Sequence, residues 1–450
     1  MSKNINLYKK LYQEKKYEEI IYKIENLEKT KSAQILHILG ICKLSKTAIS
    51  KDDKLSARED FRKAFESEKN SNVGIEALTN FINISTDFLL IDDSLKYYSE
   101  IKDKFYENLQ LLKSISRLYQ FSLRTDERIK ILKKIIDLYP SSIDDWCSYM
   151  YINNFKKNWQ QKDYYENSKK FSKNIKIDNL KKIKIDNSIT ERKIKIAFFS
   201  SDINHTHSVT YFLKTVLKNI NKNKFEIYVI SNSKKDEYKD DYKIYLNDWF
   251  NIRNLNDLEA ITFIREKKLD IIFDLMGFTS ENRINLFKNR IAPIQISWLG
   301  YCNTLGLNEM DYIFSDNNLI FDNEEKYYTE KVIRLENIWN THVGFDFERP
   351  KLLTPALKNG YITFGSLNNF NKISDETIET WSIILKKTDN STLLLKSSAD
   401  LNIEYLKKKF EKKGINQRIQ FIPRTDNFND HLNYYNLIDI ALDTFPYNGV

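Results

Sequence analysis

The chain has 450 residues, of which 41% are hydrophobic and 30% charged, a balance that is typical of globular domains and excludes a disordered protein. Its net charge of +9 comes from lysines spread along the whole chain, which favours a solvated surface over a nucleic-acid footprint. Because there is no run of about 18 apolar residues and no apolar secretory core at the N-terminus, we predict a cytoplasmic protein that is not inserted in a membrane.

Residues 1–170 are predicted to form tetratricopeptide-like helical repeats. A 34-residue period with two helices per unit is the signature of these repeats, in which each helix pair buries one face against its neighbour. Gly40 is a small residue that lets paired helices approach closely. The concave face of such a solenoid would bind a protein or peptide. The register is seen at Leu44, Leu78, Leu112 and Trp146.

The second half of the chain has a different pattern. Residues 171–192 are rich in lysine and lose the helical register, so we predict a linker there. From 193 to 350, short apolar strands alternate with helices, which predicts a parallel, doubly wound sheet. A second set spans 351–450, with three clear strands and a helix predicted over 431–442. The predicted fold class is α + α/β, a solenoid followed by two Rossmann-like units of which the second is incomplete.

Loops that follow the strands of the first α/β unit carry candidate chemistry, because open α/β sheets bind ligands at the carboxyl ends of their strands. His205 and His207 follow the first strand, where a histidine can act as a base; a pair of surface histidines is the alternative. Thr279 follows the third predicted strand, and Tyr301 lies in a Gly-Tyr turn after the strand 294–299.

In the second α/β unit, Asn369 and Lys372 lie between a strand and a helix. A lysine beside amides at a helix N-terminus is a candidate anion site, since free backbone N–H groups and the helix dipole favour phosphate. His431 begins the next predicted helix. Neither unit contains GxGxxG or a P-loop, so a standard dinucleotide or ATP site is not indicated. A base on one unit and a phosphate site on the other favour group transfer from a nucleotide donor.

Five motifs in one order resemble the O-linked N-acetylglucosamine transferase family, including its bacterial and plant SPINDLY-type members. They cover most of residues 193–450, and the family also carries helical repeats upstream. The motifs are SSDINHTHSVTYFL (200–213), DLMGFTSENRINLF (274–287), RIAPIQISWLGYCNTLGLNEMDYIFSD (290–316), FGSLNNFNKIS (364–374) and RIQFIPRTDNFNDHLNYYNLIDIALDTFPYNG (418–449).

The resemblance implies a GT-B type, inverting glycosyltransferase that needs no metal and no cofactor. It would move GlcNAc, or a related sugar, from a UDP-sugar to Ser or Thr hydroxyls of proteins. Residues 193–350 would form the acceptor side and residues 351–450 the UDP-sugar side. The three scattered cysteines, which lack metal-ligand spacing, agree with the absence of a metal site.

The resemblance also implies roles for single residues. His207 matches the active-site histidine of the family, as base or orienting group, and His205 is the alternative because this loop is one residue longer. Asn369 and Lys372 match positions that contact the UDP phosphates, so Lys372 would stabilise the leaving diphosphate.

His431 and Asp443 match positions near the nucleotide. Thr279, Tyr301 and Asn448 complete the substrate-binding residues that the resemblance implies.

The chain departs from the family at three places. Phe278 stands where bacterial relatives often have histidine, and Cys302-Asn303 replaces the usual Pro-Gly. The sequence ends at Val450, before a glycine- and threonine-rich loop, so we expect a fragment that binds donor weakly or not at all. An interaction scaffold with a degenerate α/β part and an enzyme acting on the sugar itself, such as an epimerase, are the alternative functions.

Overall fold

The computed structural model of the protein describes residues 2–28, 31–176, 183, 192–204, 207–342, 344, 354–397, 400–425 and 427–449. It contains two compact units, Met1–Leu138 with Ser397–Asn416 and Tyr139–Lys396 with Gln417–Val450. Among the helices in the described ranges, none combines the length and the hydropathy that a membrane crossing needs.

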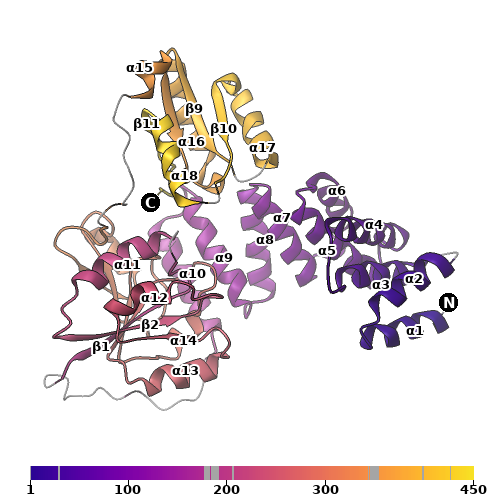
Figure 1. The fold of residues 1–450 in the computed structure, drawn as a ribbon, viewed down its shortest axis with the longest axis horizontal. Helices are drawn as coiled ribbons and strands as arrows, with labels where there is room; N and C mark the ends of the chain where they lie inside the picture. The colour runs from indigo at the N-terminus through magenta and orange to yellow at the C-terminus, as the bar shows by residue number, and fades with distance from the viewer. Residues whose placement is uncertain are drawn as a thin grey trace. The chain divides into compact units, whose positions relative to one another are not determined.

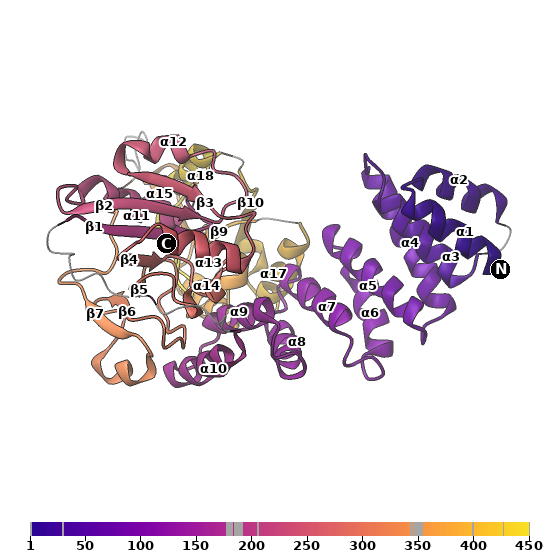
Figure 2. The same cartoon turned by 90° about the horizontal axis from the view of Figure 1, so that it is seen from below.

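The first unit is helical, and helices along its N-terminal part pack against their neighbours, as in the pairs α3 with α4, α4 with α5 and α7 with α8 (Figures 1 and 2). The segment from Ser397 to Asn416 adds one further helix, α17 (Asp400–Glu411), to this unit. The other helices are α1 (Ser2–Gln13), α2 (Tyr17–Leu27), α3 (Ala33–Leu44), α4 (Lys51–Ser67), α5 (Asn72–Asp87), α6 (Ile91–Ile101), α7 (Leu109–Phe121) and α8 (Thr125–Leu138).

Short polar side chains begin several of these helices. Ser50, before α4, accepts a hydrogen bond from the Asp53 backbone N–H at 3.0 Å, and the Asp53 carboxylate accepts from the Ser50 N–H at 3.0 Å. Ser71 and Asn108 cap α5 and α7 in the same way, through the backbone N–H groups three residues later. Each such cap satisfies a backbone donor that a helix leaves free at its N-terminus and stabilises the helix by about 1 kcal/mol.

The 34-residue register faces the cores of the helical layers. Leu78, Leu112 and Trp146 are buried, and Leu44 packs half-buried against the core of the first unit. A Cβ on Gly40 would lie only 2.7 Å from the Phe61 ring, so glycine is what allows α3 and α4 to pack this closely. The predicted stacking of helices in the N-terminal region is confirmed.

The second unit begins with α9 (Ile143–Ile152), the 3₁₀ helix η1 (Asn153–Phe155) and α10 (Gln161–Asn174). Helix α10 continues into the segment that the sequence predicts as a linker, because Phe171 is buried and lies 5.3 Å from the Phe278 ring. Most of the remaining predicted linker, 177–182 and 184–191, lies outside the described residues.

A seven-stranded, fully parallel sheet follows, in the order β3-β2-β1-β4-β5-β6-β7. The order reverses between β1 and β4, and the crevice at the carboxyl ends of such a strand pair is where doubly wound folds bind ligands. Its strands are β1 (Ile194–Ser200), β2 (Phe225–Ser231), β3 (Asp248–Asn251), β4 (Ile271–Asp274), β5 (Ile294–Ser297), β6 (Tyr312–Ser315) and β7 (Lys331–Arg334).

The helices and 3₁₀ turns between these strands are α11 (Ser208–Asn219), α12 (Lys239–Tyr242), η3 (Lys243–Tyr245), α13 (Asp257–Glu266), α14 (Ile284–Lys288) and η4 (Asp322–Tyr327). The edge strands β3 and β7 were not predicted. Each has only four residues, is largely unburied and carries too few apolar side chains to show a strand pattern.

The second sheet is also parallel, in the order β10-β9-β8-β11, so its order reverses between β8 and β11. Its strands are β8 (Ile362–Ser366), β9 (Ser391–Lys396), β10 (Ile419–Ile422) and β11 (Ile440–Ala441). The connecting helices and 3₁₀ turns are α15 (Pro355–Asn359), η5 (Phe370–Lys372), α16 (Asp375–Lys387), η6 (Asn416–Arg418), α18 (Phe428–Asn433) and η7 (Tyr434–Leu437). The α/β prediction is confirmed for both sheets.

The predicted helix over 431–442 is correct for 431–437, as the end of α18 and η7, and wrong for the residues that follow. Helix α18 begins at Phe428 and ends at Asn433, and the apolar residues that follow form a fourth strand, β11, where the sequence showed three. Asp439 directs this strand, since its carboxylate accepts hydrogen bonds from the backbone N–H groups of Ala356 (2.9 Å) and Thr363 (2.8 Å). Short apolar runs fit a helix and a strand equally well until such a tertiary partner is known.

Candidate functional site

His207 lies at the carboxyl end of β1, where it caps α11. Its Nδ1 accepts a hydrogen bond from the Val209 backbone N–H at 3.4 Å, and its Nε2 lies 3.7 Å from Asp202 Oδ2. A neutral imidazole whose Nδ1 is an acceptor carries its proton on Nε2, so His207 presents an N–H to the carboxylate. Burial raises the pKa of Asp202, although the neighbouring His207 opposes this shift.

The predicted alternative, His205, lies outside the described residues. The surrounding turn is held by Thr210, whose hydroxyl accepts from the Asn204 backbone N–H at 2.9 Å and donates to the Asp202 carbonyl at 3.2 Å. This turn, between β1 and α11, fixes the backbone of Asp202 beside the histidine.

The loop after β4 is held by a buried carboxyl group. Asp274 accepts hydrogen bonds from the backbone N–H groups of Met276 and Gly277, both at 3.0 Å. Burial raises the pKa of Asp274 to about 6, and these two hydrogen bonds limit the shift. Gly277 has φ +55°, and a Cβ there would lie 2.4 Å from Tyr301, so the loop and the Tyr301 turn pack directly together.

The side chains of two predicted substrate-binding residues, Thr279 and Tyr301, make contacts within this loop region. The Thr279 hydroxyl donates to the Met276 carbonyl at 2.8 Å, which turns it back onto its own loop. Tyr301 is buried, and its ring packs edge-on against Phe278 at 5.3 Å. Phe278 is also buried, and in this chain it fills a hydrophobic contact with α10.

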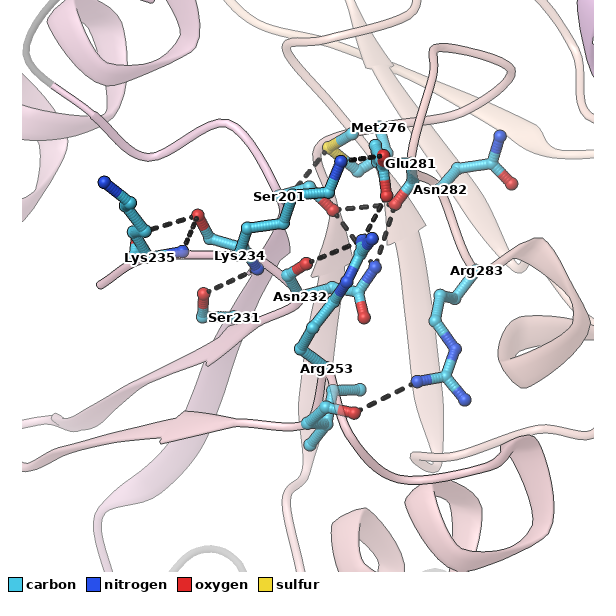
Figure 3. A network of polar contacts seen from close by, with 12 residues as sticks. Ser201, Ser231, Asn232, Lys234, Lys235, Arg253, Met276, Glu281, Asn282 and Arg283 are labelled. Carbon is cyan, nitrogen blue, oxygen red and sulfur yellow. Dashed lines mark hydrogen bonds and ion pairs between the residues drawn. The ribbon is translucent and has the colours of Figure 1, made fainter. Parts of the chain in front are cut away.

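The same edge of the first sheet carries a polar network centred on Glu281 (Figure 3). The Glu281 carbonyl accepts from the Ser201 hydroxyl at 2.7 Å and from the Asn232 amide at 3.0 Å, while its carboxylate pairs with Arg253 and, at 3.3 Å, with Lys234. Arg283, in the same loop, instead pairs with Asp257. This network connects the loop after β4 to the ends of β1, β2 and β3. Most of its charged side chains are paired with each other.

The second sheet places Lys372 at the carboxyl end of β8. Its ammonium Nζ donates to the Asn448 carbonyl at 2.9 Å and lies 4.7 Å from the centroid of the Tyr447 ring. Burial lowers the pKa of Lys372, and the negative charge of Asp443 opposes this shift.

Asp443 organises the end of β11. Its Oδ1 accepts from the Asn368 side-chain amide at 2.9 Å and from the Gly449 backbone N–H at 2.6 Å. Asn369 caps η5, since its Oδ1 accepts from the Asn371 backbone N–H at 3.0 Å. Of the predicted residues, the structure therefore brings Lys372, Asp443, Asn448 and Asn369 to one edge.

His431 lies in α18 beside a lysine that sequence reasoning missed. Lys396, the last residue of β9, has its Nζ 2.9 Å from His431 Nδ1. Burial lowers the pKa of both groups; the charge of Arg424 adds to the effect on Lys396, and that of Lys396 adds to the effect on His431. Lys396 could have been predicted as a site residue from the sequence, because it lies at the carboxyl end of a predicted strand.

Neither Lys372 nor Lys396 forms an ion pair with a carboxylate in the part of the chain that the structure describes. Half-buried ammonium groups without a counter-ion are costly, so an edge that carries two of them is suited to an anionic ligand. No cluster of three or more His, Cys, Asp or Glu side chains with metal-binding geometry occurs among the described residues.

Two aromatic contacts connect the edges of the two sheets. Tyr211 of α11, the helix that His207 caps, lies 5.6 Å from Phe428, the first residue of α18. The ring of Tyr151, in α9, lies 6.0 Å from that of Tyr447, and the pKa of Tyr151 is raised by burial and also by the nearby charge of Asp202. Asp202, Lys396 and Tyr447 are thus the residues that the structure adds to the predicted set.

Comparison with known proteins agrees with this geometry. Residues 173–344 match the family described as Glycosyl transferase family 41. A Hordeum vulgare protein named "Probable UDP-N-acetylglucosamine--peptide N-acetylglucosaminyltransferase SPINDLY" is 33% identical over 271 residues, which cover 58% of this chain and 28% of that protein. The protein of the same name from Arabidopsis thaliana is 32% identical over 269 residues, which cover 58% of this chain and 29% of that protein.

The match therefore spans less than a third of the length of these plant relatives. Among solved structures, an O-GlcNAc transferase mutant from Thermobaculum terrenum has a TM-score of 0.71 at 21% identity, covering 88% of this chain and 76% of that chain. That similarity shows the fold, in which helical repeats precede two α/β sheets. Residues 173–344 are thus similar to glycosyl transferase family 41, and the chain has the fold of the O-GlcNAc transferase from Thermobaculum terrenum.

Proposed function

We propose that the protein transfers GlcNAc, or a related sugar, from a UDP-sugar to Ser or Thr hydroxyls of proteins. The observation that carries this proposal is the pair of half-buried lysines, Lys372 and Lys396, at the carboxyl edge of the second sheet without carboxylate partners among the described residues. The matched relatives are named as peptide N-acetylglucosaminyltransferases that use UDP-N-acetylglucosamine, which supports the same donor and acceptor classes.

The diphosphate of the donor would meet Lys372, and Asn369 would add an amide to the same side. His431, kept neutral by burial and by Lys396, and Asp443 would lie near the nucleoside. Thr279, Tyr301 and Asn448 are proposed as neighbours of the sugar or acceptor. Thr279 would act mainly through its backbone, since its hydroxyl donates to the Met276 carbonyl. Asn448 would act through its side-chain amide, since its backbone carbonyl accepts from Lys372.

Transfer requires one bond to form and one to break at the anomeric carbon of the sugar. The acceptor hydroxyl oxygen attacks this carbon from the side opposite to UDP, the bond to the β-phosphate oxygen breaks, and UDP leaves with the bonding electrons. Attack from the opposite side inverts the anomeric configuration. The Lys372 ammonium would stabilise the charge that develops on the diphosphate, an electrostatic effect worth about 100- to 1,000-fold in rate.

The hydroxyl proton needs an acceptor, and the tautomer of His207 favours Asp202 for this task. Because Nε2 carries the imidazole proton, His207 would hold and orient the Asp202 carboxylate rather than take a proton itself. Burial raises the pKa of Asp202, which makes its carboxylate a stronger base than an exposed one.

The charge that many nucleotide-sugar enzymes take from a divalent cation would come here from Lys372 and Lys396. We therefore propose that transfer needs neither a metal ion nor a cofactor. The helical repeats would bind the protein acceptor, since a solenoid presents an extended surface to an unfolded segment.

The test is transfer of labelled GlcNAc from UDP-GlcNAc to a protein acceptor, with and without EDTA. We expect a β-linked sugar on Ser or Thr, released by mild alkali, and less than about a twofold effect of the chelator. A protein that binds or hydrolyses UDP-GlcNAc but labels no protein would contradict the proposed acceptor class. A loss of transfer in EDTA that is restored by one divalent cation would contradict metal independence.

A further inference from the structure

We propose that Tyr447, held by Tyr151 and Phe155, is a positioning residue that fixes the Lys372 ammonium where an anionic ligand can meet it. The inference deepens the proposed function, because Lys372 is there the group that meets the donor diphosphate. Its physical basis is a chain of contacts from η1 through one aromatic ring to one ammonium group.

Lys372 reaches its position by two contacts from a single segment. The Asn448 carbonyl accepts from Nζ at 2.9 Å, and the adjacent Tyr447 ring lies 4.7 Å from the same atom. A cation over an aromatic face is stabilised by about 0.5–2 kcal/mol, more where water is excluded. Neither contact is with a carboxylate, so the positive charge of the ammonium is not neutralised. Its remaining hydrogens can therefore be donated to an anion.

Tyr447 in turn belongs to a cluster of three rings. Its centroid lies 5.0 Å from that of Phe155 at 82° and 6.0 Å from that of Tyr151 at 66°, while Tyr151 and Phe155 lie 5.6 Å apart at 82°. All three contacts have the edge-to-face geometry that aromatic pairs prefer. Because two rings pack edge-on against it, the Tyr447 ring has little freedom to rotate.

The position of Tyr151 gives this cluster a second connection. The Asp202 charge acts on its hydroxyl, so Tyr151 lies near the proposed base at the first sheet as well as beside Tyr447 at the second. Because the ring contacts of Tyr151 and Phe155 lead to Tyr447, a change at either residue should move Lys372 without touching it.

Lysine reactivity tests the proposal without requiring any ligand. The protein is acetylated with limiting sulfosuccinimidyl acetate, and the rate at Lys372 is measured by peptide mass spectrometry against exposed Lys387 in the same molecule. Because an ammonium held by a ring and a carbonyl is protected, Tyr447→Leu should raise the relative rate at Lys372 about fivefold. Tyr447→Phe, which keeps the ring, should stay within about twofold.

Tyr361→Leu is the matched control, because this exposed tyrosine lies at the amino end of β8, away from the lysine. It should leave the Lys372 rate unchanged. An unchanged rate in folded Tyr447→Leu would overturn the proposal. If Tyr447→Leu loses its cooperative thermal transition, Phe155→Leu decides instead: it should raise the Lys372 rate about twofold to threefold, and an unchanged rate would overturn the proposal.

UDP binding, measured by calorimetry, separates this inference from the proposed function. Tyr447→Leu should weaken UDP about fivefold in the native background but less than about twofold when Lys372→Ala is already present. Equal losses in both backgrounds would mean that Tyr447 acts independently of Lys372 and would overturn the positioning role. If Lys372→Ala alone leaves UDP affinity unchanged, the diphosphate assignment fails, while the reactivity result still decides the position of Lys372.

Discussion

The two parallel sheets have the same arrangement of strands at their carboxyl edges, but the charged side chains at the two edges differ in whether they have partners of opposite charge. At the first edge, charged groups are matched within the fold: Glu281 pairs with Arg253 and Lys234, and Asp274 is bonded to two backbone N–H groups. At the second edge, Lys372 and Lys396 contact a carbonyl and an imidazole, and neither meets a carboxylate within ion-pair distance among the described residues.

This difference indicates which kind of ligand group each edge is suited to bind. A site that satisfies its own charges is rigid and suits the orientation of a neutral hydroxyl, for which Asp202 and His207 remain. A site with unmatched ammonium groups gains most from an anion, because the ligand supplies the missing counter-charge. The comparison therefore supports the proposed division, with proton transfer at the first sheet and diphosphate binding at the second.

The largest effect is expected when the charge of the second edge is removed. Lys372→Ala should reduce transfer by about 100- to 1,000-fold, because the leaving diphosphate loses its closest ammonium. Initial rates with UDP-GlcNAc and a protein acceptor provide the measurement. Lys387→Ala, an exposed lysine in α16, is the matched control and should behave like the native protein. Equal rates for both variants would remove the distinction between the edges.

At the first edge, His207→Ala should lower the turnover number by about 100-fold, within the range of general acid–base catalysis. If His207 acts as an N–H donor to Asp202, then His207→Gln, whose amide also donates, should retain about tenfold more turnover than His207→Ala. A glutamine variant as slow as the alanine variant would instead indicate that the imidazole itself takes the proton. Asp202→Asn should be at least as slow as His207→Ala.

The affinity for UDP should fall at high pH, and earlier than an ordinary lysine would predict. The folded-state pKa values of Lys372 and Lys396 are lowered from 10.5 by burial, so the charged forms that bind diphosphate are lost at a lower pH. Calorimetry in steps from neutral pH upward should show a decline of about tenfold before pH 10.5. Lys396→Arg, which stays charged, should make this decline shallower; an identical profile would exclude Lys396 from the ligand site.

The smallest effect on binding is expected for Asp274, whose role is in stability. The pKa is raised from 3.8 to about 6, so the folded state binds more protons in this window and its stability falls as the pH rises through it. The loss amounts to about 3 kcal/mol and should be reduced in Asp274→Asn, which cannot ionise.

Urea unfolding at several pH values between 4 and 7 measures this slope. The exposed residue Asp389 provides the control, and Asp389→Asn should keep the native slope. Because Asp274 lies at the first edge, where the charged groups already have partners in the fold, UDP affinity should change by less than about twofold in Asp274→Asn. A large change in affinity would mean that the two edges are coupled more tightly than their charges indicate.

Much of the fold followed from local pattern. The long strands β1 and β2 and helix α11 have apolar periods that one segment displays by itself. Strands β3, β7 and β11 could not be predicted from the sequence, because each is short and is defined by its neighbour in the sheet rather than by its own residues. The 431–442 error has the same origin, since Asp439 selects the strand only when β8 is present.

The site divides in the same way. The sequence alone determined which loops follow the strands, and so identified His207, Lys372, Asn369, His431 and Asp443 by position and family resemblance. Only the tertiary structure paired His207 with Asp202, placed Lys396 against His431 and set Tyr447 under Lys372, because these partners are distant in sequence or differ in which way a side chain turns. Proton position and charge balance depend on those neighbours, and a chain pattern does not contain them.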